Sequence, residues 1–322
     1  MGRTYKPVDL GEIKTYSAQQ RKHKSSVKSM AALPGAGAKA SELIDSFPSF
    51  LGAVALRNVV GAIVDAVEQD RPVVVAFGAH VLKVGCGPIL VDLIQRGVVK
   101  AIVGNGACAI HDVELATLGE TSEEVADSIK DGTFGMVAET MAFFDEAVAM
   151  SRRDSMGLGD AVGRLLIERE APFRDRSVYV AAREASIPAT VHVALGTDTI
   201  HASGALDVAV LASASMSDFR LVCDVVRDLG AGDGGDVGGV WMNIGSAVLL
   251  PEVFLKAVSV ARNLGANLDL MTTANFDMIR QYRPHQNVVT RPVSAARGYE
   301  VVGHHEILLP LLRQAVIERL GS

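Results

Sequence analysis

The chain alternates short apolar runs that end in glycine with longer segments of helical character. This alternation limits the possible folds more than any other feature. Residues 73–77 are continuously apolar and are followed by Gly78, and residues 98–103 form a second run that ends at Gly104. Such runs are typical of parallel strands buried on both faces. Helices between parallel strands cover both faces of the sheet. The sequence therefore predicts a doubly wound α/β fold with a mostly parallel sheet.

The same rhythm predicts the remaining elements. Further strands are expected at residues 189–195, 237–244, 268–271 and 299–302, and helices at 88–96, 109–118, 123–130, 136–151, 161–170, 217–229, 251–264 and 306–320. Thr121 and Glu124 have the spacing of a capping box, which marks the start of one helix. Ser217 and Asp218 are expected to cap another.

Residues 1–48 differ in character from residues 49–322. Basic side chains are scattered through the first segment, at Lys14, Arg21, Lys22, Lys24 and Lys28. We interpret residues 1–48 as an N-terminal arm that is mobile or packs on a neighbouring subunit. A nucleic-acid-binding arm is the weaker alternative, because the charges are few and dispersed. Residues 49–322 are expected to form a single α/β domain.

Composition excludes several classes of protein. The net charge of −6 and an aromatic content of 5% disfavour a nucleic-acid partner. The three cysteines have no paired spacing, which favours a reducing compartment. No apolar run has the length of a membrane span, and the first residues lack the apolar region of a signal peptide. We therefore expect a cytoplasmic protein without membrane or nucleic-acid partners.

One motif after a predicted strand is similar to a dinucleotide fingerprint. Gly104-x-Gly106-x-x-Ala109 follows a strand and opens a helix. Its glycines would let backbone amides approach a pyrophosphate at a helix N-terminus. The alternative is an ordinary tight turn. The acidic residue expected about twenty positions later has no clear counterpart, since Glu123 and Glu124 belong to the capping box.

Histidines and carboxylates also gather after the predicted strands. In open parallel sheets, ligands bind beyond the carboxyl ends of the strands. The polar residues expected there are His111, Asp112, Glu114, Asp198, His201, His304, His305 and Glu306. Such side chains suit acid–base chemistry or a divalent metal. None has a helical metal-binding spacing, so no metal site is assigned.

Two lysines are candidate nucleophiles. Lys256 lies four residues after Glu252 on a helix that Pro251 begins, and the default interpretation is a surface ion pair. The pair could instead face the ligand edge of the sheet, where a dry pocket would lower the pKa of a lysine. Lys83 lies in a glycine-rich loop, where it could meet a phosphate or carboxylate, or act as a nucleophile.

The chain resembles the deoxyhypusine synthase family from about residue 72 to its end. The likeness rests on loops and short runs along the second half and on the two loops after the first strands: Gly78–Gly87, Asn105–Asp112, Ile187-Pro188, Gly196-Thr197-Asp198, Gly245-Ser246-Ala247, Arg262–Ala266 and Leu309–Leu312. The resemblance implies a homotetramer that binds NAD between subunits. It also implies an aminobutyl transfer from spermidine through an imine on a lysine.

The resemblance implies roles in NAD binding, whereas the candidate catalytic residues come from the residue patterns described above. The implied NAD-binding residues are Gly78, His80, Lys83, Gly85, Asn105, Gly106, Ala107, Asp112, Thr197, Asp198, Gly245 and Ser246. The candidate catalytic residues are Lys256, Glu252, His201 and His305.

One departure from the family affects the reaction. Leu250 stands where the family has its imine-forming lysine, and leucine cannot form an imine. The leading interpretation is an NAD-dependent transferase, similar to deoxyhypusine or homospermidine synthase, that acts on a polyamine or related amine. An acidic pocket would suit such a cation. The alternatives are a metal-dependent hydrolase that uses the histidine and carboxylate cluster, and a nucleotide-binding protein without catalysis.

Overall fold

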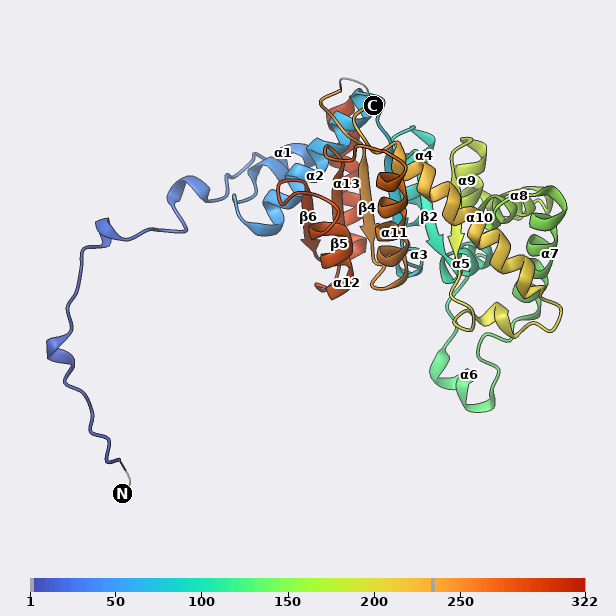
Figure 1. The fold of residues 1–322 in the computed structure, drawn as a ribbon, viewed down its shortest axis with the longest axis horizontal. Coiled ribbons are helices and arrows are strands. Elements are labelled where there is room, and N and C mark those ends of the chain that lie inside the picture. The colour runs from blue at the N-terminus through green and yellow to red at the C-terminus, as the bar shows by residue number, and fades with distance from the viewer. Residues whose placement is uncertain (1–2, 233–234, 322) are drawn as a thin grey trace.

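The computed structural model describes residues 3–232 and 235–321, which form an α/β fold around one sheet (Figure 1). Within these residues the sheet has six strands in the order β3-β2-β1-β4-β5-β6. The strands are β1 (Val73–Phe77), β2 (Ala101–Asn105), β3 (Ala189–His192), β4 (Val240–Ile244), β5 (Thr272–Asp277) and β6 (Gly298–Val302). Every neighbouring pair is parallel. The predicted doubly wound fold is confirmed.

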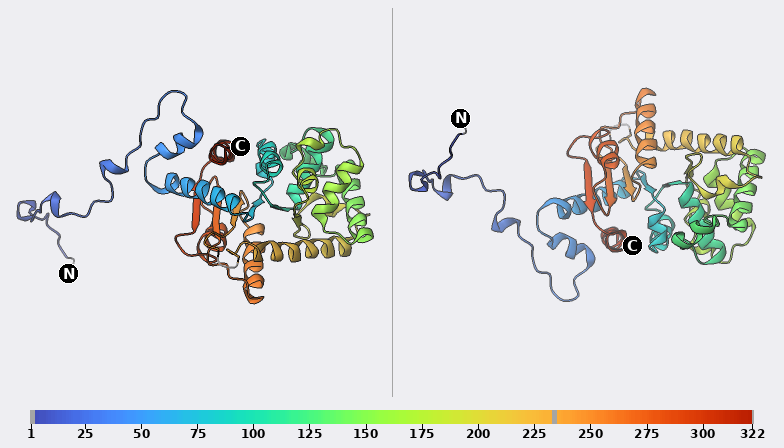
Figure 2. Two further views of the ribbon diagram at one scale, coloured as in Figure 1. Left: turned by 90° about the horizontal axis from the view of Figure 1, so that it is seen from above. Right: turned by 90° about the horizontal axis from the view of Figure 1, so that it is seen from below.

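Helices cover both faces of the sheet because successive strand residues point to opposite sides. Val74 and Ala76 of β1 join one core cluster, whereas Val75 and Phe77 join the other. Figure 2 shows α10 and α11 on one side of the sheet, opposite α4 and α13. The helices are α1 (Ala40–Ser46), α2 (Leu51–Glu68), α3 (His80–Lys83), α4 (Gly87–Gln95), α5 (Gly106–Leu118), α6 (Val125–Asp131), α7 (Ala138–Asp154), α8 (Leu158–Glu168), α9 (Val178–Glu184), α10 (Val208–Arg227), α11 (Leu249–Asn263), α12 (Tyr282–Pro284) and α13 (His305–Leu320).

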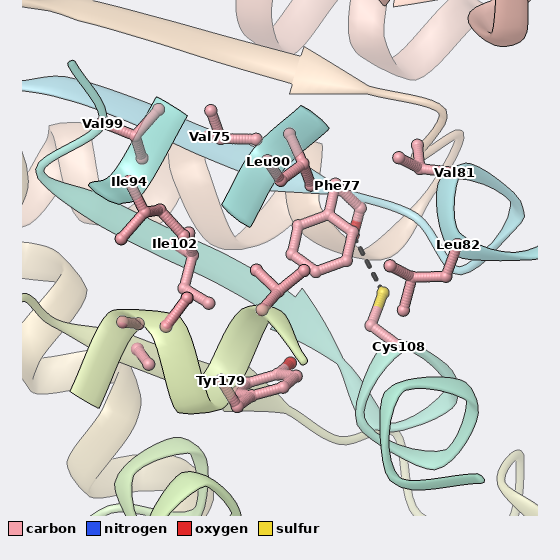
Figure 3. Packing of buried hydrophobic residues seen from close by; sticks show 14 of the residues in the cluster. Val75, Phe77, Val81, Leu82, Leu90, Ile94, Val99, Ile102, Cys108 and Tyr179 are labelled. Atoms are coloured by element: carbon pink, nitrogen blue, oxygen red, sulfur yellow. Dashed lines mark hydrogen bonds between the residues drawn. The ribbon is translucent and has the colours of Figure 1, made fainter. Parts of the chain in front are cut away.

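The core beneath β1 and β2 fixes the start of α5. Figure 3 shows Cys108 directed at β1, where its thiol donates a hydrogen bond of 3.0 Å to the carbonyl of Phe77. A β-carbon at Gly104 would lie 2.3 Å from the hydroxyl of Tyr179. Glycine is therefore required at position 104 by packing against a side chain of the chain itself.

Several predicted boundaries are wrong. The fifth strand runs over Thr272–Asp277 and not over 268–271, where buried residues lead into the strand. The cap of α6 is Glu124, whose carboxylate accepts a hydrogen bond from the amide of Ala126. Thr121 does not cap this helix, because its hydroxyl donates to Glu114.

Helix α10 begins nine residues before the predicted cap, at Val208, and Asp207 accepts the capping hydrogen bond from the amide of Val210. Asp218 therefore lies inside the helix. Its carboxylate reaches across to the amides of Gly159 and Val191, at 3.1 Å and 2.8 Å. A polar residue that holds two other elements together was mistaken for a local cap.

Residues 3–28 extend away from the body of the molecule (Figure 1) and are all exposed, whereas Ser29 and Ala32 form backbone hydrogen bonds with Ser49 and Ser46. The chain joins the body at α1, which packs on α13. Glu318 accepts a hydrogen bond of 2.8 Å from the amide of Ser41, and Arg319 pairs with Asp45. The Ser41 amide is the main reason that the pKa of Glu318 falls to about 2. No helix in the described part of the chain has the length and apolar character needed to cross a membrane.

Candidate active site

The strand order reverses between β1 and β4, and this switch point is where open parallel sheets usually bind ligands. The two strand ends are in direct contact, because the amide of Gly78 donates a hydrogen bond of 2.8 Å to the carbonyl of Ile244. A β-carbon at Gly78 would lie 2.1 Å from the carbonyl oxygen of Gly245. Gly245 has a φ of +65°, which favours glycine. The two strand ends are thus closely packed against each other, and the ring of His305 fills the space of a side chain at Gly245.

Two histidines lie beside this backbone. The rings of His80 and His305 meet edge to face, with their centroids 5.8 Å apart. His305 is buried, and its Nε2 lies 3.3 Å from the carbonyl of Phe276 while its Nδ1 has no partner among the described residues. Burial is the largest cause that lowers the pKa of His305, which is therefore neutral at physiological pH. Its free Nδ1 is an acceptor at the switch point.

Several other predicted ligand residues have local structural roles. Ser246 accepts a hydrogen bond from the amide of Leu250 and stands at the start of α11. Gly85 has a φ of +77° in the turn between α3 and α4. Asn105 caps α5 by accepting a hydrogen bond of 3.0 Å from the amide of Cys108.

The fingerprint glycines lie at the end of β2 and the start of α5, and not at the switch point. The Tyr179 hydroxyl occupies the space that a side chain at position 104 would need. A β-carbon at Gly106 would lie 2.0 Å from Oδ2 of Asp198. Both glycines make room for side chains of the chain itself, so the motif marks close packing at the start of α5.

Asp112 faces inward and takes no part in the surface of this edge. It is 1% exposed, and its carboxylate accepts hydrogen bonds from the Ser177 hydroxyl and, at 2.8 Å, from the Val178 amide. Burial raises the pKa of Asp112 to about 6. The carboxylate links α5 to the start of α9.

A cavity of about 520 Å³ lies at the carboxyl edge beside α5. Its polar lining consists of Lys83, His111, Glu114, Glu120, Thr121, Ser122, Glu123, Thr140, Thr197, Asp198 and Thr199, and its apolar lining includes Ile110, Leu118, Val125, Phe134 and Val137. Four carboxylates face one lysine, so the cavity is acidic between apolar walls. Of the predicted ligand residues, it brings together Lys83, Ala107, Thr197 and Asp198.

Glu114 anchors one wall of the cavity in its charged form. It accepts hydrogen bonds from the hydroxyls of Thr121 and Thr140, and Thr121 accepts one of 2.6 Å from Nδ1 of His111. Burial tends to raise the pKa of Glu114, but the contacts with His111 and the two threonines outweigh it and the pKa is lowered. A fixed negative charge therefore faces the cavity.

Residues 119–137 cover the cavity on one side. Helix α6, which stands out from the body in Figure 1, contributes no buried residue. Within the segment, Glu123 accepts a hydrogen bond of 2.6 Å from the amide of Gly135. A β-carbon at Gly135 would lie 2.6 Å from Cβ of Thr199, so this loop packs closely on the short 3-10 helix Thr199–Ala202.

Asp198 and His201 lie together at the opposite wall. Their side chains are 8% and 9% exposed, and Oδ2 of Asp198 lies 3.8 Å from Nε2 of His201. Burial, as the largest cause, raises the pKa of Asp198, and the nearby His201 opposes this rise. This pair is the most enclosed acid–base group at the cavity.

Lys256 stands apart from the cavity. Its ammonium pairs with Glu252 on α11, and the two side chains are 58% and 38% exposed. Glu252 also accepts a hydrogen bond of 2.9 Å from the buried Asn287 and pairs with the exposed Arg283. The dry pocket expected around Lys256 is absent within the described chain. Leu250, at the family's lysine position, is completely buried in the core.

The sequence interpretation missed the role of the acidic segment around α6. Glu120 and Glu123 line the cavity, yet the pattern of residues 121–124 predicted only a helix cap. Glu120 and Glu123 do not directly follow a predicted strand, so the sequence did not indicate that they line the cavity. Within the described residues, no three histidine, cysteine, aspartate or glutamate side chains are arranged to hold a metal ion.

No protein-family model matches the chain, and no curated protein matches it by sequence. Solved structures do match its fold. AgrE, determined as a ternary complex with ornithine and NAD⁺, has a TM-score of 0.55 at 14% identity over 83% of this chain. This chain spans 33% of the AgrE chain.

For two further structures, the match includes a larger share of the other protein's chain. A LOR/SDH protein from Methanococcus maripaludis S2 has a TM-score of 0.51 at 14% identity, over 89% of this chain and 72% of its own. A protein assigned as a deoxyhypusine synthase from Entamoeba histolytica has a TM-score of 0.50 at 13% identity, over 88% of this chain and 94% of its own. At these identities the likeness is one of fold: the chain has the Rossmann-like α/β architecture that all three proteins share.

Proposed function

We propose that this chain is an NAD-dependent enzyme that acts on a small aliphatic amine, with NAD at the switch point and the amine in the acidic cavity. The observation that carries the proposal is the position of the cavity at the carboxyl edge of the sheet. Lys83 follows β1, Ala107 follows β2, and Asp198 follows β3, and all three residues line the cavity. A substrate there would lie next to a ligand bound across the strand ends.

The lining of the cavity supports a cationic substrate with an apolar chain. Glu114, Glu120, Glu123 and Asp198 outnumber the single lysine, so the local potential favours cations. Ile110, Leu118, Val125, Phe134 and Val137 offer apolar contacts to methylene groups. Ornithine, which AgrE binds together with NAD⁺, and the polyamines are both alkyl amines of this kind.

The residues at the switch point suit a dinucleotide. The Gly78 and Gly245 backbones meet at the carboxyl ends of β1 and β4, where a pyrophosphate would lie against main-chain groups. The half-buried ring of His80, packed edge to face on His305, offers a polar and flat surface beside it. NAD, when bound, would supply the acceptor for a hydride, and the residues of the chain would orient the amine and exclude water.

Transfer of an alkylamine group is the second candidate, and a specific observation favours it. Lys83 is the only lysine among the residues that line the cavity. It could therefore form the imine for which Leu250 is unsuited. Lys256, in its exposed pair with Glu252, lies outside the cavity lining.

Amine-dependent reduction of NAD⁺ tests the proposal. Purified protein is mixed with NAD⁺ and spermidine, 1,4-diaminobutane or ornithine, and NADH fluorescence is followed. We expect NADH to form with at least one of these amines. Glu120→Lys reverses a charge at the cavity and should weaken the amine's KM about tenfold or more, equal to about 1.4 kcal/mol.

Glu184→Lys is the matched control, because Glu184 is exposed at the end of α9, before β3. It should leave KM unchanged. Equal effects of the two charge reversals would show that the cavity does not bind the amine. No NADH with any of the three amines would remove amine oxidation from the account.

A further inference from the structure

Asp198 and His201 bury two polar atoms that the described chain leaves without partners. Oδ2 of Asp198 and Nε2 of His201 face each other at 3.8 Å, beyond hydrogen-bond distance. Both atoms are buried. Buried polar groups are nearly always paired, and exceptions concentrate where a ligand or chemistry uses them. The pair lies at a cavity wall, because Asp198 lines the cavity and His201 stands behind it.

The backbone sets the proton position on His201. Its Nδ1 accepts hydrogen bonds from the amides of Gly196 and Asp198, at 3.1 Å and 3.2 Å. A ring nitrogen that accepts cannot carry a hydrogen, so the neutral ring has its hydrogen on Nε2. That N–H faces the carboxylate of Asp198. The loop over residues 196–201 thus holds a donor behind the carboxylate.

We propose that Asp198 is the proton acceptor for the amine substrate and that His201 is its positioning residue. The proposal rests on the proposed function, since it needs an amine in the cavity. An N–H bond of the substrate ammonium breaks, and its electron pair stays on nitrogen. The proton forms a new O–H bond at Oδ1 of Asp198, the carboxylate oxygen that does not face His201. The product of this step is a neutral amine, the form from which a hydride can be removed.

The surroundings of Asp198 suit this role. Burial raises the pKa of Asp198, so its carboxylate is a stronger base than one in water. The charged groups on the cavity walls are Lys83, His111, Glu114, Glu120 and Glu123, and Cys108 lies behind on α5. His201 lowers the pKa of Asp198 and so limits the rise. A carboxyl group whose pKa is raised by burial and lowered by a neighbouring histidine can both accept and return a proton.

Carboxyl NMR of the full ligand-free chain tests the assignment without substrate or cofactor. Aspartate is labelled at the side-chain carboxyl carbon, and the Asp198 signal is identified by its loss in Asp198→Asn. We expect Asp198 to titrate above the ordinary aspartate range. His201→Gln should raise its midpoint further, because the opposing influence of His201 is removed. Asp175→Asn identifies an exposed aspartate as the control for ordinary titration.

Imidazole nitrogen spectra of the same protein should show the His201 hydrogen on Nε2. An Asp198 midpoint within or below the ordinary range would overturn the assignment. So would an unchanged or lower midpoint in His201→Gln, or a hydrogen on Nδ1 of His201. None of these outcomes affects the proposed function.

A binding titration with 1,4-diaminobutane provides the second arm. Its affinity for the wild-type chain should fall as the pH drops through the midpoint of Asp198, and Asp198→Asn should remove this dependence. An identical pH dependence in Asp198→Asn would overturn the role of Asp198 while leaving the amine site intact. Absence of diamine binding at every pH would overturn both this inference and the proposed amine site.

Discussion

The backbone of Gly106 lies directly against the carboxylate of Asp198, so that a β-carbon at position 106 would sit 2.0 Å from Oδ2. The first turn of α5 and the loop after β3 therefore depend on each other. The glycine places the carboxylate at the cavity wall, where His201 stands behind it. The absence of a side chain at Gly106 thus determines where the Asp198 carboxylate is held.

Gly106→Ala should displace Asp198 from the cavity wall. The added methyl group cannot share the space of Oδ2, so the carboxylate must turn away. We expect the affinity for 1,4-diaminobutane to fall about tenfold, or about 1.4 kcal/mol, as measured by calorimetry. Gly204→Ala is the control, since a β-carbon there meets nothing within 4 Å. Equal affinity in the two variants would contradict the close packing at Gly106.

Lys83→Ala and Lys256→Ala should differ in their effect on turnover. Lys83 lines the cavity, and its removal should lower kcat/KM for the amine substantially. Lys256 forms an exposed pair with Glu252, and its removal should change the free energy of unfolding by only about 0.3–0.5 kcal/mol and spare turnover. Steady-state kinetics and urea unfolding give both quantities. Loss of turnover in Lys256→Ala with normal folding would restore the catalytic lysine to α11.

Asp218 should make stability depend on pH. Burial raises the pKa of Asp218 from 3.8 to about 7 in the folded chain. Its stabilising contribution is complete below the unfolded pKa and is lost as the pH rises through the folded pKa. Between pH 4 and pH 7, the unfolding free energy of the wild type should therefore fall relative to that of Asp218→Asn. The expected slope is about 1 kcal/mol per pH unit.

Denaturant unfolding of both proteins across this range measures the difference. Asparagine can keep its carbonyl oxygen where Oδ2 accepts the amides of Gly159 and Val191. Asp112 is present in both proteins, so its own titration cancels. A constant difference across the range would mean that Asp218 is ionised in the folded chain throughout.

The exposed N-terminal segment leads us to expect a homo-oligomer. Residues 3–39 carry exposed apolar side chains, including Leu10 at 68% and Leu33 at 94%. Such side chains on an extended segment are typical of contacts with another subunit. Light scattering should show an assembly larger than the monomer, with a tetramer as the specific expectation. Removal of residues 3–39 should lower its stability on dilution, and a monomeric full chain would contradict this expectation.

The first strand was predictable because it is a continuous apolar run followed by glycine, and the alternation of strands with helices indicated the rest of the sheet. β1, β6 and α13 match their predicted positions closely. The strand at Thr272–Asp277 was missed because it contains polar residues that are buried. Asn275 and Asn243 pair across β5 and β4 at 2.8 Å, which hides their polarity inside the sheet. Hydrophobic pattern alone cannot detect a buried amide pair.

The candidate site was predictable only where it follows the strands. Lys83, Ala107, Thr197 and Asp198 were found from their position after predicted strands, and they line the cavity. The positions of Glu120 and Glu123 at the cavity were not predicted, because they depend on the path of residues 119–137 in three dimensions. Asp112 has the same local pattern as a surface ligand but turns inward to Ser177. Sequence neighbours do not determine the direction of a side chain on a helix that is buried on several sides.

Titration of the purified chain with NAD⁺, followed by calorimetry and by amide hydrogen exchange, tests the central claim most directly. The account predicts saturable binding at one site per chain. It also predicts slower exchange at residues 78–87 and 245–249, which surround the contact between Gly78 and Gly245. Absence of binding at millimolar NAD⁺, or protection confined to segments away from β1 and β4, would contradict the account.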